Sequence, residues 1–267
     1  MTTRAELDAL ARDLADEQAS LDGLVAAIDD AAWRLDTPAA GWTVLDQIGH
    51  LAYFDAAAAV AILDPEAFNR SLEAVATVAV TGGLDEFTLG PWRALAPSAV
   101  LAGWRANRAS LAVAATALEP DRRVPWYGPA MSAASFLTAR LMETWAHGTD
   151  VADALGTHLE ATDRLVHVAR LGFITRGWSY AVRGETAPEG RVRVELTGPS
   201  GATWTWGDAP AEDVVRGPAE DFCLVVTQRR HLEDTALVTG ELGRHWLVRA
   251  QAFAGGATTG PNPKERP

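Results

Sequence analysis

Residues 38–55 read PAAGWTVLDQIGHLAYFD, and this stretch decides how the first half of the chain folds. Its proline and glycine interrupt regular structure. Thr43 and Asp46 then form a capping signal, in which side chains satisfy free N–H groups at the start of a helix. Apolar residues follow at helical spacing, namely Val44, Ile48, Leu51, Ala58 and Ile62. The stretch therefore predicts a loop and then an amphipathic helix, with His50 beside its apolar face.

Three further long helices are predicted from capping residues and apolar spacing, at residues 3–28, 98–118 and 132–155. The first begins with a capping box formed by Thr3 and Glu6. Between the helix that carries His50 and the helix at residues 98–118, Pro65 opens a less regular stretch that ends at the double glycine of residues 82–83. Four long helices joined by loops predict an antiparallel bundle over residues 1–160.

The sequence changes in character after about residue 160, and it predicts a small α+β domain over residues 161–255. A helix over residues 163–183 leads into this domain as a bridge. Residues 191–196 alternate between apolar and charged side chains, which is the periodicity of a strand. The other predicted elements are an antiparallel strand at 203–206, a short strand at 214–215, and helices at 217–230 and 241–254. Residues 256–267 have no apolar periodicity, and we expect a disordered tail there.

Charge and composition argue against several classes of partner. The 267 residues carry a formal net charge of −12 at pH 7, and such a surface repels nucleic-acid backbones and anionic membranes. The acidic, amphipathic N-terminus lacks the apolar core of a signal peptide. We therefore expect a cytoplasmic protein with no nucleic-acid and no membrane partner. The single cysteine, Cys223, lies in the apolar run FCLVV and is predicted to be a core residue.

Three side chains on two predicted helices could bind one metal ion. Glu143 and His147 are spaced i, i+4, which places them on the same helix face. His50 lies on another helix of the bundle, and facing helices are where bundle proteins build metal sites. Two histidines and one carboxylate leave a coordination position open, as in catalytic zinc sites. We expect Asp46, one turn before His50, to accept the second ring N–H of that histidine.

The spacing of these residues also has simpler interpretations. Most E-x-x-x-H pairs are solvated helix faces or local hydrogen bonds, and a histidine beside an apolar stripe is often a buried structural residue. Trp42 and Trp126 lie in loops beside these helices, where their rings could wall a pocket for a cofactor, as could the neighbouring Tyr127. The remaining histidines are interpreted as surface or structural residues, and they are His158, His167, His231 and His245.

Residues 38–55 and the later segment ETWAHGTDVADALG, residues 143–156, together resemble a known family. They are similar to the DinB-like metal-binding bundle of the mycothiol-dependent maleylpyruvate isomerases. The resemblance implies an α+β protein with an N-terminal DinB-like four-helix bundle, followed by a small domain akin to sterol carrier proteins. It also implies that His50, Glu143 and His147 bind Zn²⁺. Fe²⁺, Ni²⁺ and Mn²⁺ stay open as alternatives to zinc.

The family's chemistry implies what such a metal site would do. An external thiol, mycothiol in this family, is held as thiolate and adds to an activated double bond; rotation and elimination then give the isomer. The resemblance therefore implies a thiol-dependent isomerase or S-transferase acting on a small electrophile. Arg229, or equally Arg230, would bind an acidic substrate, although arginines at a helix C-terminus are also favoured by the helix dipole. The alternative is a non-catalytic metal-binding protein whose second domain binds a ligand or partner. The sequence leaves the substrate and the oligomeric state open.

Overall fold

The computed structural model describes residues 2–80 and 83–266, and it divides the chain into two compact units, Met1–Leu159 and Glu160–Pro267. The helices of the N-terminal unit are α1 (Arg4–Val25), α2 (Val44–Leu63), α3 (Pro65–Val80), α4 (Leu84–Arg93), α5 (Pro97–Thr116) and α6 (Ala133–Ala154). Two short antiparallel strands, β1 (Arg123–Val124) and β2 (Met131–Ser132), precede α6. No described helix is long and apolar enough to cross a membrane.

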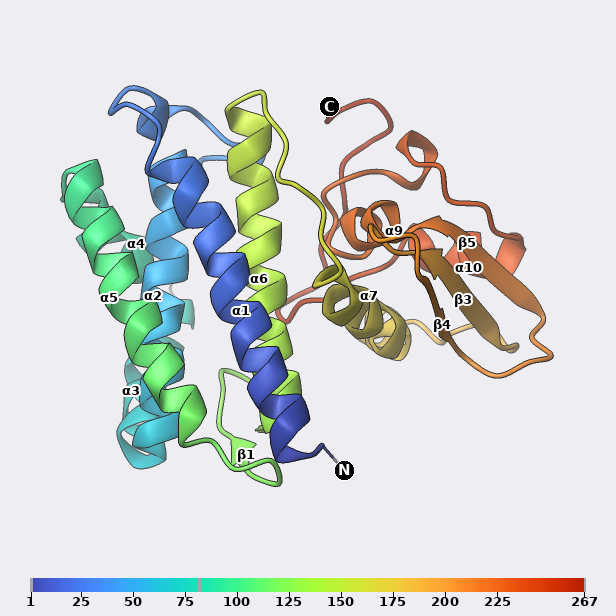
Figure 1. Cartoon of the computed structure of the whole chain (residues 1–267), viewed down its shortest axis with the longest axis horizontal. Helices are drawn as coiled ribbons and strands as arrows, with labels where there is room; N and C mark the ends of the chain where they lie inside the picture. Colours follow the sequence, from blue (N-terminus) through green and yellow to red (C-terminus); the bar gives the residue numbers. More distant parts are fainter. Residues whose placement is uncertain (1, 81–82, 267) are drawn as a thin grey trace. The chain divides into compact units, whose positions relative to one another are not determined.

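The four long helices α1, α2, α5 and α6 form a bundle and run alongside one another (Figure 1). Their inward faces supply a core whose fully buried members include Leu21, Ile48, Leu51, Trp104 and Val151. The predicted four-helix bundle is therefore confirmed. The two predicted capping boxes are also present, and the one formed by Thr43 and Asp46 fixes the first turn of α2.

The stretch after Pro65 was predicted to be irregular, but it is the helix α3. Proline is well tolerated in the first turn of a helix, where its missing N–H group is not needed. The carboxylate of Asp64 accepts a hydrogen bond from the backbone N–H of Ala67 at 2.9 Å, which caps this turn. Gly82, where the irregular stretch was expected to end, lies outside the described residues. The helix α4, which contains Pro91, was not predicted either.

One buried carboxylate joins all four long helices. Asp55 on α2 accepts hydrogen bonds from Gln18 on α1 at 3.0 Å, Trp104 on α5 at 3.1 Å, and Arg140 on α6 at 2.9 and 3.2 Å. The Asp55 side chain is fully buried, and that of Arg140 is 4% exposed. Burial raises the pKa of Asp55, while the N–H donors act in the opposite direction. The network fixes where α2 and α6 stand relative to each other.

The C-terminal unit is a small α+β unit, as predicted. Its elements are α7 (Leu165–Ile174), α8 (Arg176–Ala181), β3 (Val192–Thr197), β4 (Thr203–Trp206), β5 (Asp213–Pro218), α9 (Ala219–Val226) and α10 (Glu241–Leu247). The strand order is β4-β3-β5, with β4 antiparallel to β3 and β5 parallel to it. The predicted bridge helix at 163–183 is interrupted at Thr175, which separates α7 from α8.

The helices α9 and α10 end earlier than predicted, at Val226 and Leu247 instead of residues 230 and 254. For α9 the cause is local: Gln228 has a φ of 63°, and the N–H groups of Gln228 and Arg229 return to the carbonyls of Val225 and Leu224. This is the hydrogen-bond pattern of a helix that closes on a left-handed residue. Glutamine gives no signal for such a stop, unlike glycine.

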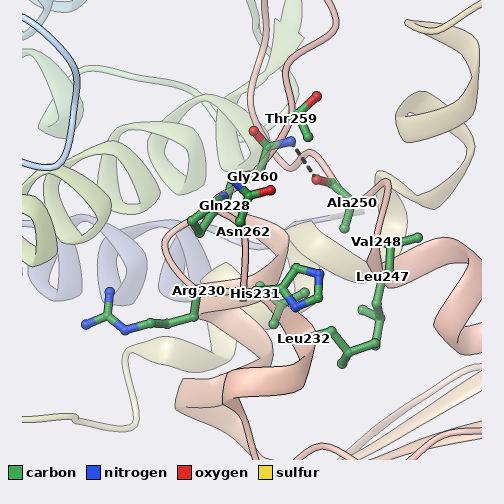
Figure 2. Close-up of a pocket in the computed structure, with 12 residues that line it drawn as sticks. Gln228, Arg230, His231, Leu232, Leu247, Val248, Ala250, Thr259, Gly260 and Asn262 are labelled. Atoms are coloured by element: carbon green, nitrogen blue, oxygen red, sulfur yellow. Dashed lines mark hydrogen bonds between the residues drawn. The ribbon is translucent and has the colours of Figure 1, made fainter. Parts of the chain in front are cut away.

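Residues 256–266, where we expected a disordered tail, form neither helix nor strand. Their polar groups nevertheless form hydrogen bonds with earlier residues of the C-terminal unit. The Thr258 hydroxyl donates to Gln228 at 2.8 Å, and the Lys264 backbone N–H donates to Asp234 at 2.7 Å. Thr259 and its neighbours help to line a small cavity of about 120 Å³ beside the end of α9 (Figure 2). The composition of the tail did not predict these contacts.

Candidate metal centre

The structure brings His50, Glu143 and His147 together. A carboxylate oxygen of Glu143 lies 3.5 Å from His50 Nε2 and 3.1 Å from His147 Nε2. One potential ligand atom from each of the three residues lies within 4.8 Å of the others. We call these three residues the cluster, and it is the group that could hold a metal ion among the residues that the structure describes. The arrangement is that of three donors around one common point, and no fourth histidine, cysteine, aspartate or glutamate of residues 2–80 and 83–266 belongs to it.

Two packed helices produce this convergence. Glu143 and His147 are one turn apart on α6, so their side chains leave the helix on the same face. His50 reaches them from α2, which packs against α6, and the rings of His50 and His147 have centroids 4.3 Å apart. All three side chains are mostly covered, with exposures of 17% for His50, 24% for Glu143 and 11% for His147.

The electrostatics of the cluster favour the protonation states that metal ligands need. Burial, together with the neighbouring His147, lowers the pKa of His50 to about 4, so this imidazole is neutral near pH 7. Burial alone raises the pKa of Glu143, but hydrogen bonds with His147 and His50 bring it well below its usual range. A neutral imidazole and an ionised carboxylate are the metal-binding forms of these groups.

The expected hydrogen-bond partner of His50 was wrong. Asp46 does not contact His50 through a described hydrogen bond: its carboxylate accepts from Thr43 in the capping box and from Arg93 at 2.7 Å. Its neighbour Gln47 instead bonds to Nδ1 of His147 through its side-chain oxygen. The physical reason is that the Asp46 carboxylate already accepts the capping hydrogen bonds in the first turn of α2. Gln47, in contrast, is fully buried and turned toward α6.

Gln47 fixes the tautomer of His147. The amide nitrogen of Gln47 donates to the Thr37 hydroxyl at 2.8 Å, and that hydroxyl donates to the carbonyl of Trp42 at 2.9 Å. This chain leaves the amide oxygen of Gln47 as an acceptor, so Nδ1 of His147 carries the proton. Nε2 of His147, which lies 3.1 Å from Glu143, is then the ring nitrogen left to bind a metal ion, and it hydrogen-bonds to Glu143 only when it also carries a proton. Gln47 was not among the residues predicted to support the site.

The two tryptophans predicted to wall the site lie at different distances from it. The Trp42 ring stacks on His147 with centroids 5.9 Å apart and contacts His50 at 5.2 Å. Trp126 lies one ring further away: it contacts Phe54 at 6.1 Å, and Phe54 in turn contacts His50 at 4.5 Å. Phe54, which the sequence analysis did not single out, is thus nearer to the histidines than Trp126.

The remaining candidate residues belong to the C-terminal unit. Arg229 and Arg230 follow the end of α9; Arg229 donates to the carbonyl of Thr227 at 2.7 Å, and Arg230 lines the cavity of Figure 2. The expected role of Arg229 in substrate binding stays a prediction. Cys223 is buried in the core of this unit, and burial raises the pKa of its thiol well above the usual value. A buried thiol with a raised pKa is a poor nucleophile.

The fold and the site define a helix-bundle protein with a candidate histidine–carboxylate metal centre, extended by a small α+β unit. Comparison with known families is consistent with this class. The sequence profile of the mycothiol maleylpyruvate isomerase N-terminal domain matches residues 14–152. The chain therefore belongs to the mycothiol-dependent maleylpyruvate isomerase family.

Relatives and solved structures give the same assignment. Uncharacterised proteins from two Mycobacterium tuberculosis strains, CDC 1551 / Oshkosh and ATCC 25618 / H37Rv, are each 46% identical over 244 residues, which is 91% of this chain and 94% of the relative. The crystal structure of the mycothiol-dependent maleylpyruvate isomerase aligns with a TM-score of 0.58 at 20% identity, over 89% of this chain and 95% of that one. A histidine-to-alanine mutant of that enzyme aligns with a TM-score of 0.56 at 18% identity over the same shares. These structures show the shared fold.

A second family profile, described as wyosine base formation, matches residues 188–239 of the C-terminal unit. The match covers β3, β4, β5 and α9. It concerns a small part of the chain, and a net charge of −12 does not favour a nucleic-acid substrate. We therefore build the proposed function on the N-terminal unit.

Proposed function

We propose that His50, Glu143 and His147 bind one Zn²⁺ ion and that the protein is a cytoplasmic, thiol-dependent isomerase or S-transferase acting on a small electrophile. Mycothiol is the thiol that the family assignment suggests. The observation that carries the proposal is the convergence of two imidazole nitrogens and one carboxylate oxygen within 4.8 Å. Two histidines and one carboxylate suit zinc, although Fe²⁺, Ni²⁺ and Mn²⁺ accept the same donors.

The residues of the cluster fit such an ion in three respects. The imidazole of His50 is neutral, Glu143 is ionised, and Gln47 holds the tautomer of His147 that offers Nε2. When bound, Zn²⁺ would keep an external thiol in its reactive thiolate form. The thiol must come from outside the chain because Cys223, its single cysteine, is buried in the other unit. Arg229 is retained as the proposed cation for a carboxylate of the substrate, with Arg230 as the alternative.

A coupled assay tests the catalytic part of the proposal. Zinc-loaded protein is incubated with mycothiol and a panel of small α,β-unsaturated carbonyl compounds, and loss of each electrophile is followed by chromatography. We expect consumption or isomerisation of at least one electrophile only when both the metal and the thiol are present. A metal-loaded protein that accelerates no reaction in the panel would favour the non-catalytic alternative, a metal-binding protein whose second domain binds a ligand or partner.

The role of Gln47 gives a separate prediction. Gln47→Leu should weaken zinc binding about 10- to 100-fold, because His147 loses the acceptor that fixes its ring and tautomer. Zinc affinity would be measured by competition with a chromogenic chelator.

Asp46→Ala is the matched control, one residue away on the same helix. It should leave zinc affinity within about threefold and lower the free energy of unfolding by about 1–2 kcal/mol, through loss of the cap and of the contact with Arg93. Equal zinc affinities for wild type and Gln47→Leu would contradict the assignment of Gln47.

A further inference from the structure

Five half-buried aromatic side chains lie next to the candidate metal centre, and we call them the aromatic cluster: Trp42, Tyr53, Phe54, Trp126 and Tyr127. The cluster is continuous with the metal-binding residues, because Trp42 and Phe54 both contact the ring of His50. Phe54 then contacts Tyr53 at 5.0 Å, Tyr127 at 5.5 Å and Trp126 at 6.1 Å. The ring of His50 thus contacts two members of the cluster, and that of His147 contacts one, Trp42.

Two buried phenylalanine rings support Trp126, a member of the aromatic cluster. Trp126 stacks on the buried ring of Phe68, with centroids 5.5 Å apart and planes inclined by 5°. It also meets the buried Phe136 edge-on at 5.1 Å. Rings supported in this way keep their orientation without a ligand, so they can contribute stacking surface at little entropic cost.

The polar atoms of three members of the cluster, Trp42, Tyr53 and Tyr127, are already engaged. The Trp42 indole N–H donates to Asp85 at 3.0 Å. Tyr127 bonds to Tyr53 through its hydroxyl, and burial, followed by this contact, raises the pKa of Tyr127 so that the phenol stays neutral. What these residues offer to a ligand is therefore the faces and edges of their rings.

The cation that contacts Phe54 is engaged as well. Arg140 lies with its guanidinium carbon 5.9 Å from the centroid of Phe54, but its nitrogens donate to Asp55 and its side chain is 4% exposed. A carboxylate on a ligand could not reach this charge without breaking the buried pair, which is unfavourable. Arg140 thus offers no free charge to an anionic ligand beside the aromatic cluster.

We infer that the aromatic cluster binds a planar conjugated or aromatic part of the electrophilic substrate and holds it against the metal centre. This inference rests on the proposed function, because it assigns a substrate class to the same site. Aromatic rings favour planar partners through offset or edge-to-face contacts. A saturated ring of similar size gains the same hydrophobic burial but not this geometry, so the two can be compared directly.

Calorimetric titration without thiol tests the inference, since no addition reaction occurs. The probes are three neutral enones that share one reactive group: trans-4-phenylbut-3-en-2-one, its cyclohexyl analogue, and pent-3-en-2-one. We expect the phenyl compound to bind about three- to tenfold more tightly than the cyclohexyl compound. Phe54→Leu and Trp42→Leu should each reduce this preference to less than about twofold, while Trp178→Ala, an exposed indole of the C-terminal unit, should leave it unchanged.

Two controls keep the outcomes separate. Circular dichroism and metal content show whether each variant is folded, and the leucine replacements keep apolar volume so that at least one is expected to fold. Equal binding of the phenyl and cyclohexyl compounds, or a preference that survives both leucine variants, would overturn the inference. If the wild type contains no metal, the proposed function fails, but the same titration on the metal-free protein still tests the aromatic cluster.

Discussion

The double variant His50→Ala, His147→Ala is expected to contain less than about 0.1 metal ion per chain, against about one in the wild type, because three donors are needed to hold the ion. Only Glu143 would remain in the cluster, and a single carboxylate does not retain a divalent ion through dialysis. Elemental analysis of dialysed protein measures this directly. The wild-type arm of the experiment also identifies the metal.

A matched pair of histidines provides the control. His231 and His245 lie in the C-terminal unit, where His231 accepts a backbone hydrogen bond from Glu233 and His245 bonds to the Tyr180 hydroxyl at 2.9 Å. Replacing both by alanine should leave the metal content unchanged. If the His50/His147 variant kept its metal, or if the control lost it, the ion would have to lie elsewhere in the chain.

The bundle was predictable because its signals are local. Thr43 and Asp46 begin α2 as the sequence indicates, and the apolar spacing that follows identifies the face that carries His50. Glu143 and His147 could be paired because an i, i+4 spacing fixes their relative direction on any helix. That His50 faces this pair depends on how α2 and α6 pack, and for that step the family resemblance was needed.

The failures have equally specific causes. Asp46 was assigned to His50, although its carboxylate was already needed in the capping box that the same sequence predicted. Gln47 lies only one position further along α2, and a rotation of one residue on a helix changes the neighbour that a side chain meets. Pro65 was taken as the start of an irregular stretch because a proline signals either a break or a first helical turn, and only the preceding Asp64 distinguishes the two here.

A missed signal in the sequence concerns Asp55. It lies in the apolar stripe of α2, between Leu51 and Ala58, where a carboxylate without partners would be strongly unfavourable. Arg140 has a similar position on α6, with the buried residues Leu137 about one turn before it and Thr144 one turn after it. Two opposite charges on the apolar faces of different helices predict a buried ion pair. The structure contains this pair and adds Gln18 and Trp104 as further donors.

Asp55→Ala is expected to lower the free energy of unfolding by about 3–5 kcal/mol, because it leaves a buried guanidinium without its partner. The Gln18 amide and the Trp104 indole N–H would lose their acceptor at the same time, which adds to the unfavourable free energy. Such a loss is a large fraction of the 5–15 kcal/mol that typically stabilises a folded protein. Urea denaturation followed by circular dichroism at 222 nm measures it.

Two comparisons show whether the buried charge is the cause. Asp8→Ala removes an exposed i, i+4 partner of Arg4 on α1 and should change the free energy of unfolding by less than about 1 kcal/mol. Asp55→Leu combined with Arg140→Met should be less destabilised than Asp55→Ala, because no unpaired charge is left in the core. If Asp55→Ala were as stable as the double variant, Arg140 would have found another partner. The Asp55 carboxylate would then not be what holds α2 and α6 in register at the metal centre.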